Sequence, residues 1–164
     1  MRGGAELVHS VDSSAKAIEL TKQNVELNFP NDPRHEAFCE DAFKFLEGIQ
    51  CSTFNVQRSM SYDLIILDPP AFAKHRGALH NALKGYTRLN QKAFEKIEKG
   101  GILFTFSCSQ VVTKDHFRNA VFTAAALAKR KVRILHQLHQ PADHPINIYH
   151  PEGEYLKGLV LYVE

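Results

Sequence analysis

The predicted architecture follows from one segment, Tyr62-Asp63-Leu64-Ile65-Ile66-Leu67-Asp68-Pro69-Pro70-Ala71-Phe72. Residues 64–67 form an unbroken apolar run of β-forming residues, which is typical of a strand buried on both faces. The run ends at Asp68, and two prolines then prevent both further strand pairing and an immediate helix. The sequence therefore predicts a carboxylate on a stiff turn at the carboxyl end of a central strand. In open α/β sheets, ligands bind at that edge.

Strand and helix patterns alternate along the rest of the chain. Strands are predicted at 7–11, 35–39, 63–67, 102–107, 132–138 and 156–163, and helices at about 15–25, 42–47, 86–99 and 113–127. Gly100-Gly101 is predicted to stop the third helix, and residues 50–61 to form a polar surface insertion. This order predicts a single α/β domain over residues 1–164, with a doubly wound, Rossmann-like and mostly parallel sheet that ends in an antiparallel hairpin.

Composition limits the classes of function. The chain has 164 residues, 44% of them hydrophobic, and a formal charge of +2, which alone is too small to argue for nucleic acid. The chain has no run of about 18 apolar residues, so no membrane span is predicted, and no signal peptide is visible. The three cysteines show neither a pairing pattern nor metal-ligand spacing, which predicts a cytoplasmic protein without a metal site. The spacing of His136, His139, His144 and His150 also fits no standard metal set.

Polar residues follow four of the predicted strands. They are Asp12, Asp41, Asp68 and the run Ser107-Cys108-Ser109. An acid at such a position can accept hydrogen bonds from a ribose diol, which suits Asp12, but Asp12 can equally cap the next helix. Asp41 can accept from an adenine amino group or cap the short helix after it. The sequence leaves both pairs of alternatives open.

Cys108 follows the apolar strand at 102–106 and is flanked by two hydroxyl residues. Such a thiol is either an activated nucleophile or a small core residue. Asp68, at the end of the neighbouring predicted strand, favours the first interpretation. An acid and a thiolate on adjacent strands suit addition to an electron-poor ring, with the acid bonded to a ring nitrogen.

Several motifs together carry a family resemblance. They are Leu67-Asp68-Pro69-Pro70-Ala71-Phe72, Lys84-Gly85-Tyr86, Gly100-Gly101-Ile102-Leu103-Phe104-Thr105-Phe106-Ser107-Cys108-Ser109, Ala142-Asp143-His144-Pro145 and Pro151-Glu152-Gly153-Glu154-Tyr155-Leu156-Lys157-Gly158. Over essentially the whole chain, they resemble the bacterial large-subunit ribosomal RNA 5-methylcytosine methyltransferases. These are class I enzymes that depend on S-adenosylmethionine (SAM).

The resemblance implies a mechanism and a set of contacts. Cys108 would add to C6 of a cytosine in ribosomal RNA, C5 would take the methyl group of SAM, and Asp68 would hydrogen-bond N3 and the amine. The implied cofactor contacts are Asp12, Ser13, Asp41, Ala42, Asp68 and Pro69. The implied substrate contacts are Pro70, Phe72, Lys74, Arg76 and Ser107.

The chain also departs from the family pattern. The N-terminal RNA-binding module, the first strand and its Gly-rich turn are missing, so the chain resembles a C-terminal part that starts at an internal Met. The absent strand would leave two unpaired inner edges, which predicts weak SAM binding, little activity and a homodimer that covers the edges.

Two other functions remain open. An enzyme of the same fold could methylate a different atom, such as an exocyclic amine or guanine N7, which needs no thiol. A non-catalytic remnant could bind RNA through the basic segment around Lys74 and Arg76. A dehydrogenase is disfavoured because no G-x-G-x-x-G turn is present.

Overall fold

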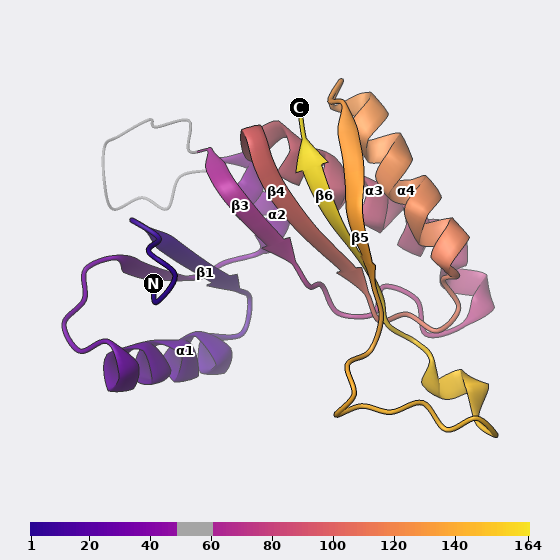
Figure 1. The fold of residues 1–164 in the computed structure, drawn as a ribbon, viewed down its shortest axis with the longest axis horizontal. Coiled ribbons are helices and arrows are strands. Elements are labelled where there is room, and N and C mark those ends of the chain that lie inside the picture. The colour runs from indigo at the N-terminus through magenta and orange to yellow at the C-terminus, as the bar shows by residue number, and fades with distance from the viewer. Residues whose placement is uncertain (49–60) are drawn as a thin grey trace. The chain divides into compact units, whose positions relative to one another are not determined.

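The computed structural model describes residues 1–48 and 61–164, which belong to two compact units (Figure 1). The first unit is Met1–Arg58 and the second is Ser59–Glu164. Each unit has its own sheet and its own buried residues. The predicted insertion at 50–61 lies outside the described residues, apart from Ser61.

The first unit is a β-α-β-α segment. Its elements are β1 (Val8–Asp12), α1 (Ala15–Asn28), β2 (His35–Cys39) and α2 (Ala42–Glu47). The two strands are parallel, with Val8 opposite His35 and Asp12 opposite Cys39. Few side chains are buried here: the hydrophobic ones are Ile18 of α1 and Leu46 of α2.

The second unit holds the larger sheet. Its elements are β3 (Tyr62–Leu67), η1 (Arg76–Ala78), α3 (Leu79–Lys96), β4 (Ile97–Ser107), α4 (Lys114–Leu127), β5 (Val132–Leu138), η2 (Pro151–Gly153) and β6 (Lys157–Val163). The strand order is β3-β4-β6-β5; β3 and β4 are parallel, and β6 is antiparallel to both of its neighbours. The predicted C-terminal antiparallel hairpin is therefore confirmed.

Helices α3 and α4 pack together on one side of this sheet (Figure 1). Between helices and sheet lie fully buried aromatic side chains, Tyr86 and Phe94 of α3 and Phe117 of α4. The strands alternate in burial, so that Leu103 and Thr105 of β4 point into this core while Ile102 and Phe104 are only partly buried. This helix-on-sheet layer fixes the ends of β3 and β4.

The third helix differs from its prediction at both ends. It begins at Leu79 instead of Tyr86 and ends at Lys96, so Gly100-Gly101 lies within β4. A Cβ on residue 101 would lie 2.7 Å from Cγ1 of Ile97 and 2.9 Å from the carbonyl oxygen of Asp63. Glycine is therefore needed because β3 and β4 approach closely there, and not to end a helix.

The fourth helix starts as predicted, since the Thr113 side chain accepts a hydrogen bond from the backbone N–H of His116. The predicted apolar face is buried at Phe117, Ala120, Val121 and Ala124. Leu127, which was predicted to share that face, is 56% exposed, so this part of the prediction is wrong. It lies in the last turn of α4, beyond the buried part of the face.

The predicted strands all form, but they pair in two sheets. Among residues 1–48 and 61–164, β1 pairs only with β2, and β3 pairs only with β4. One edge of β1 and one edge of β3 therefore have no strand neighbour in the described part of the chain. No helix within that part is both long and apolar enough to cross a membrane.

Candidate catalytic site at the ends of β3 and β4

The second unit brings Cys108 to the Asp68-Pro69-Pro70 turn. Parallel pairing places Leu67 opposite Thr105, so the two chains leave the sheet side by side. The Cys108 sulfur lies 4.0 Å from the carbonyl oxygen of Pro69, and the residue is partly buried. Asp68 is exposed at the same sheet edge. A thiol and a carboxylate thus occupy neighbouring strand ends.

A buried hydroxyl network supports this edge. The Ser107 hydroxyl donates to the Tyr86 hydroxyl at 2.9 Å, and the Tyr86 and Ser109 hydroxyls are 3.1 Å apart. The backbone N–H of Ala73 donates to the Ser109 hydroxyl at 3.3 Å. All three hydroxyl residues are at most 1% exposed. The network therefore ties the chain on both sides of Cys108 to α3 and to the loop after the two prolines.

The loop after the prolines is also held by an aromatic pair. The Phe72 ring packs on the Tyr86 ring, with centroids 4.6 Å apart. A Cβ at position 85 would lie 3.0 Å from Cδ2 of Phe72. A glycine inside α3 costs about 1 kcal/mol relative to alanine. Residue 85 is nonetheless glycine because the absence of a side chain there leaves room for the Phe72 ring.

Replacing Tyr86 by phenylalanine is expected to lower the free energy of unfolding of the chain by about 1–3 kcal/mol. The ring and its contacts stay, but the buried hydroxyls of Ser107 and Ser109 lose a shared partner. Urea denaturation followed by circular dichroism measures the change. Tyr149→Phe is the matched control, since Tyr149 is 87% exposed. An equal stability of the Tyr86→Phe variant and the wild type would contradict the network's role.

A buried lysine lies behind Cys108. Lys157, at the start of β6, is 7% exposed, and its ammonium donates to the carbonyl oxygens of Ser109 and Tyr155, both at 2.6 Å. Burial lowers the pKa of Lys157, and the nearby Cys108 and Glu154 act in the opposite direction. Sequence reasoning quoted Lys157 within a motif but gave it no role. The available signal was a charged residue that opens an otherwise apolar strand.

The long connection before β6 is fastened by Gln140, which sequence reasoning also missed. Its side-chain amide donates to the carbonyl oxygen of Gly153 at 2.7 Å and accepts from the backbone N–H of Tyr155 at 3.1 Å. Gln140 is 8% exposed. These bonds hold the chain segment that delivers Lys157 to the sheet edge.

The predicted substrate contacts lie in different surroundings. Pro70, Lys74 and Arg76 are exposed in the chain that follows β3. Phe72 is partly buried against Tyr86. The Ser107 side chain is fully buried in the hydroxyl network. This side chain therefore supports the end of β4 from within the core, and the predicted substrate contact of Ser107 stays a prediction.

The predicted cofactor residues of the first unit lie at its strand ends. Asp41 caps α2, as one of its two interpretations predicted, whereas the cap of α1 is Ser14 and Asp12 precedes it. Asp12 Oδ1 accepts from the backbone N–H of Ser14 at 2.7 Å, and Asp41 Oδ1 accepts from the N–H groups of Phe43 and Lys44. Ser13 and Ala42 are exposed beside them. In both acids these bonds are made by Oδ1, and Oδ2 can accept from a ribose or an adenine amine.

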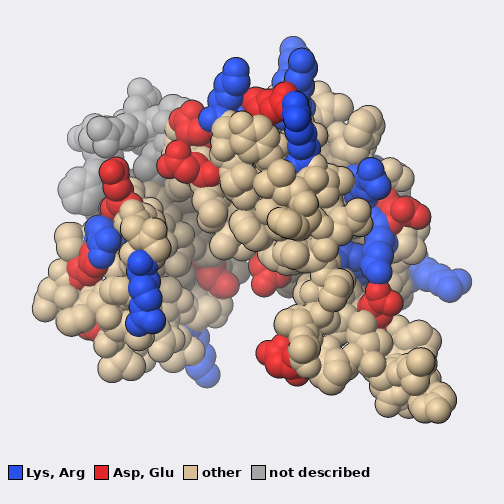
Figure 2. All heavy atoms as spheres, in the orientation of Figure 1, with Lys and Arg blue, Asp and Glu red and all other residues tan. Residues whose placement is uncertain are grey.

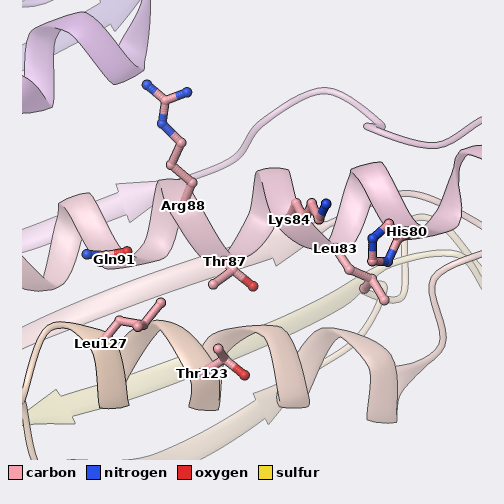
Figure 3. Close-up of a pocket in the computed structure, with 8 residues that line it drawn as sticks. All are labelled: His80, Leu83, Lys84, Thr87, Arg88, Gln91, Thr123 and Leu127. Atoms are coloured by element: carbon pink, nitrogen blue, oxygen red, sulfur yellow. The ribbon is translucent and has the colours of Figure 1, made fainter.

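The described residues offer no rival site of clear chemistry. A pocket of about 380 Å³ lies between α3 and α4 (Figure 3). Its lining is His80, Leu83, Lys84, Thr87, Arg88, Gln91, Thr123 and Leu127. Lys and Arg are interspersed with Asp and Glu over the face that Figure 2 shows. No group of three or more potential metal ligands occurs in residues 1–48 and 61–164.

Comparison with known proteins gives the chain its relatives. No protein-family model matches it. It is 39% identical over 163 residues to "Ribosomal RNA large subunit methyltransferase I" of Cronobacter sakazakii and to the protein of that name from Escherichia coli. Each match covers 99% of this chain but 40% of the relative. The chain therefore spans about two fifths of the length of these relatives.

Solved structures show the same fold. One that is described as a methyltransferase complexed with SAH covers 98% of this chain and 40% of its own, with a TM-score of 0.79 and 23% identity. At that identity the likeness is one of fold. The chain has an α/β methyltransferase fold.

Proposed function

We propose that this chain is the catalytic part of a SAM-dependent methyltransferase that acts on C5 of a cytosine in large-subunit ribosomal RNA through a Cys108 adduct. The observation that carries the proposal is the position of the Cys108 thiol beside the Asp68-Pro69-Pro70 turn. The names of the relatives support ribosomal RNA as the substrate class and methyl transfer as the reaction.

The cysteine fits this chemistry because C5 of cytosine is a poor nucleophile. Attack of the Cys108 sulfur on C6 forms an S–C6 bond and moves electron density to C5. Asp68 accepts from the exocyclic amine and, when protonated, donates to N3, which stabilises the adduct. After the methyl group is bound to C5, loss of the C5 proton to a base re-forms the C5–C6 double bond and expels the thiolate.

SAM, when bound, supplies the methyl group. In the first unit, Asp12 would hold the ribose diol and Asp41 the adenine amine, flanked by Ser13 and Ala42. Both acids sit at the amino ends of α1 and α2, with one carboxylate oxygen already fixed by backbone N–H groups. The carboxylates are thus oriented before the cofactor binds, which lowers the entropic cost of binding.

The exposed cations after the prolines suit a polyanion. Lys74 and Arg76 follow the turn that carries Asp68, so phosphates gripped there would lie next to a cytosine at the site. Such phosphate contacts would fix the position of the RNA backbone, while Asp68 would recognise the base through hydrogen bonds.

The test is methyl transfer from labelled SAM to large-subunit ribosomal RNA, followed by mass spectrometry of the nucleosides. It is run with the 164-residue chain and with a version completed by the remaining segments of the E. coli relative. We expect 5-methylcytidine from the completed version and a much weaker signal from the chain alone. Label in an N-methylated nucleoside would instead favour an enzyme that uses its Asp-Pro-Pro turn on an amine. RNA binding with no methyl transfer by either version would favour a non-catalytic RNA-binding role.

A further inference from the structure

Helices α3 and α4 carry an excess of positive charge that the rest of the chain does not share. Together they contain six Lys and Arg residues and two Asp and Glu residues. The whole chain contains 20 and 18, which leaves 14 basic and 16 acidic residues outside the two helices. A basic helical layer is thus combined with a slightly acidic remainder, a distribution that is typical of a surface for a polyanion.

Basic residues recur at every fourth position along α3. They are His80, Lys84, Arg88, Lys92 and Lys96. Residues four apart are neighbours on a helix surface, and like charges at this spacing destabilise an isolated helix. Four residues of helix rise about 6 Å, which is close to the separation of successive phosphates along one nucleic-acid strand. The spacing is therefore unfavourable for the helix alone and suited to a row of phosphates.

The first part of this row lies in the pocket of about 380 Å³ between α3 and α4, which we call the α3–α4 groove (Figure 3). Three basic residues line it, His80, Lys84 and Arg88, and its lining includes no acid. His80 and Lys84 are exposed, and neither is ion-paired with an acid within residues 1–48 and 61–164. Charge complementarity therefore favours an anion as the occupant of the groove.

The hydroxyl groups of the groove use their donors within the protein. The Thr87 hydroxyl donates to the carbonyl oxygen of Ala120 at 3.3 Å, and the Thr123 hydroxyl donates to that of Asn119 at 2.9 Å. The Lys84 ammonium brings three donors and a full charge, and lysine binds phosphate as a point charge. Lys84 is therefore the residue through which binding in the groove can be tested.

The groove lies one helix width from the candidate catalytic site. Tyr86, two residues after Lys84, is buried, and its hydroxyl accepts from Ser107, the residue before Cys108. Lys84 is exposed, on roughly the opposite side of the helix from Tyr86. A helix is about 10–12 Å across, so a phosphate at Lys84 would belong to a nucleotide a few positions away from a cytosine at Cys108.

We propose that the α3–α4 groove holds the phosphate backbone of the substrate RNA, with Lys84 bound to a phosphate of a nucleotide that flanks the methylated cytosine. This inference rests on the proposed methyltransferase function. Lys74 and Arg76 precede α3 in the chain, so the groove would extend the RNA contact from the catalytic turn along this helix. Phosphate contacts of this kind position the RNA and carry no sequence specificity.

The test is binding of the 164-residue chain to a labelled single-stranded RNA from the large subunit, without SAM, by fluorescence anisotropy over a series of salt concentrations. We expect Lys84→Gln to weaken binding at low salt roughly threefold to tenfold, equally for a scrambled RNA sequence. The slope of log Kd against log salt should fall by about 0.7, the value for one phosphate contact of a single strand. Lys84→Arg keeps the charge and should bind within about twofold of the wild type.

Lys22→Gln is the matched control, since it removes an exposed lysine from α1 of the first unit. It should leave the affinity and the salt slope unchanged. An unchanged affinity and slope in Lys84→Gln, or an equal loss in Lys22→Gln, would overturn the proposal. Tighter binding of polyglutamate than of RNA, lost in Lys84→Gln, would also overturn it and assign the groove to an acidic protein.

The groove and the methyltransferase reaction can fail separately. In the completed version, Lys84→Gln should raise the KM for RNA and leave kcat unchanged, because a phosphate contact is made equally in the ground state and the transition state. Weaker RNA binding by Lys84→Gln without methyl transfer by any version would retain the groove and remove the reaction. Methyl transfer to C5 with RNA binding unaffected by Lys84→Gln would retain the reaction and remove the groove.

Discussion

Replacing Cys108 by alanine is expected to reduce methyl transfer to C5 of cytosine by at least about 1,000-fold. Without the sulfur no adduct forms at C6, so C5 stays too electron-poor to take the methyl group. The fold should persist, because Cys108 is only partly buried and its hydrogen bond with the Pro69 carbonyl is a weak 4.0 Å contact. Label transferred from SAM to RNA by the completed version measures the loss.

Cys39→Ser is the matched control for this variant. Cys39 is an exposed cysteine of the first unit, and a serine hydroxyl keeps a donor for the Ser13 carbonyl oxygen, which lies 3.7 Å from the sulfur. Methyl transfer by this variant should stay within about twofold of the wild type. Full activity of Cys108→Ala would favour methylation of an amine or of guanine N7, which proceeds without a thiol.

Replacing Phe117 by alanine is expected to lower the free energy of unfolding by about 3–5 kcal/mol. The side chain is 1% exposed, and its ring meets the Tyr86 ring edge-on at 5.3 Å between centroids. Its removal leaves a cavity between α4, α3 and the sheet. Domains are stable by only 5–15 kcal/mol, so much of the stability of this unit would be lost.

Phe122→Ala separates this effect from a general intolerance of α4 to alanine. Phe122 is on the same helix but is 72% exposed, so its replacement should change the free energy of unfolding by less than about 0.5 kcal/mol. Urea denaturation measures both variants. Equal destabilisation by the two substitutions would show that the aromatic core beneath the site is not where the structure places it.

Local rules predicted the positions of the strands well, but not the burial of residues 64–67. These were predicted to be buried on both faces, and Leu64 and Ile66 are 52% and 62% exposed, so that part of the prediction is wrong. The apolar run at 64–67 ends at Asp68 as expected, because two prolines follow it, and Thr113 caps α4 because its hydroxyl accepts a backbone hydrogen bond. The start of α3 was missed, since the helix was predicted from about residue 86 and begins at Leu79. Gly85 lies inside it, and its contact with the Phe72 ring joins two segments apart in sequence.

Only part of the candidate site could be predicted, because several of its contacts also join segments that lie apart in sequence. Asp68 and Cys108 could be paired from the sequence, since parallel strands end at one sheet edge. The partners that hold them could not. Lys157 reaches Ser109 only because β6 pairs antiparallel with β4, and the Ser107 hydroxyl is buried only because Tyr86 of α3 covers it. Long-range pairing and packing decide these contacts, which cannot be inferred from the spacing of residues along the chain.

The most direct test of the central claim is the release of tritium from ribosomal RNA made with 5-tritiated cytidine. Each methyl group that enters C5 must displace the hydrogen on C5, whereas methylation of an amine leaves it in place. With the completed version and SAM, we predict one tritium released for each methyl group transferred, and no release by the Cys108→Ala variant. Methyl transfer to RNA without tritium release would contradict the proposed reaction at C5.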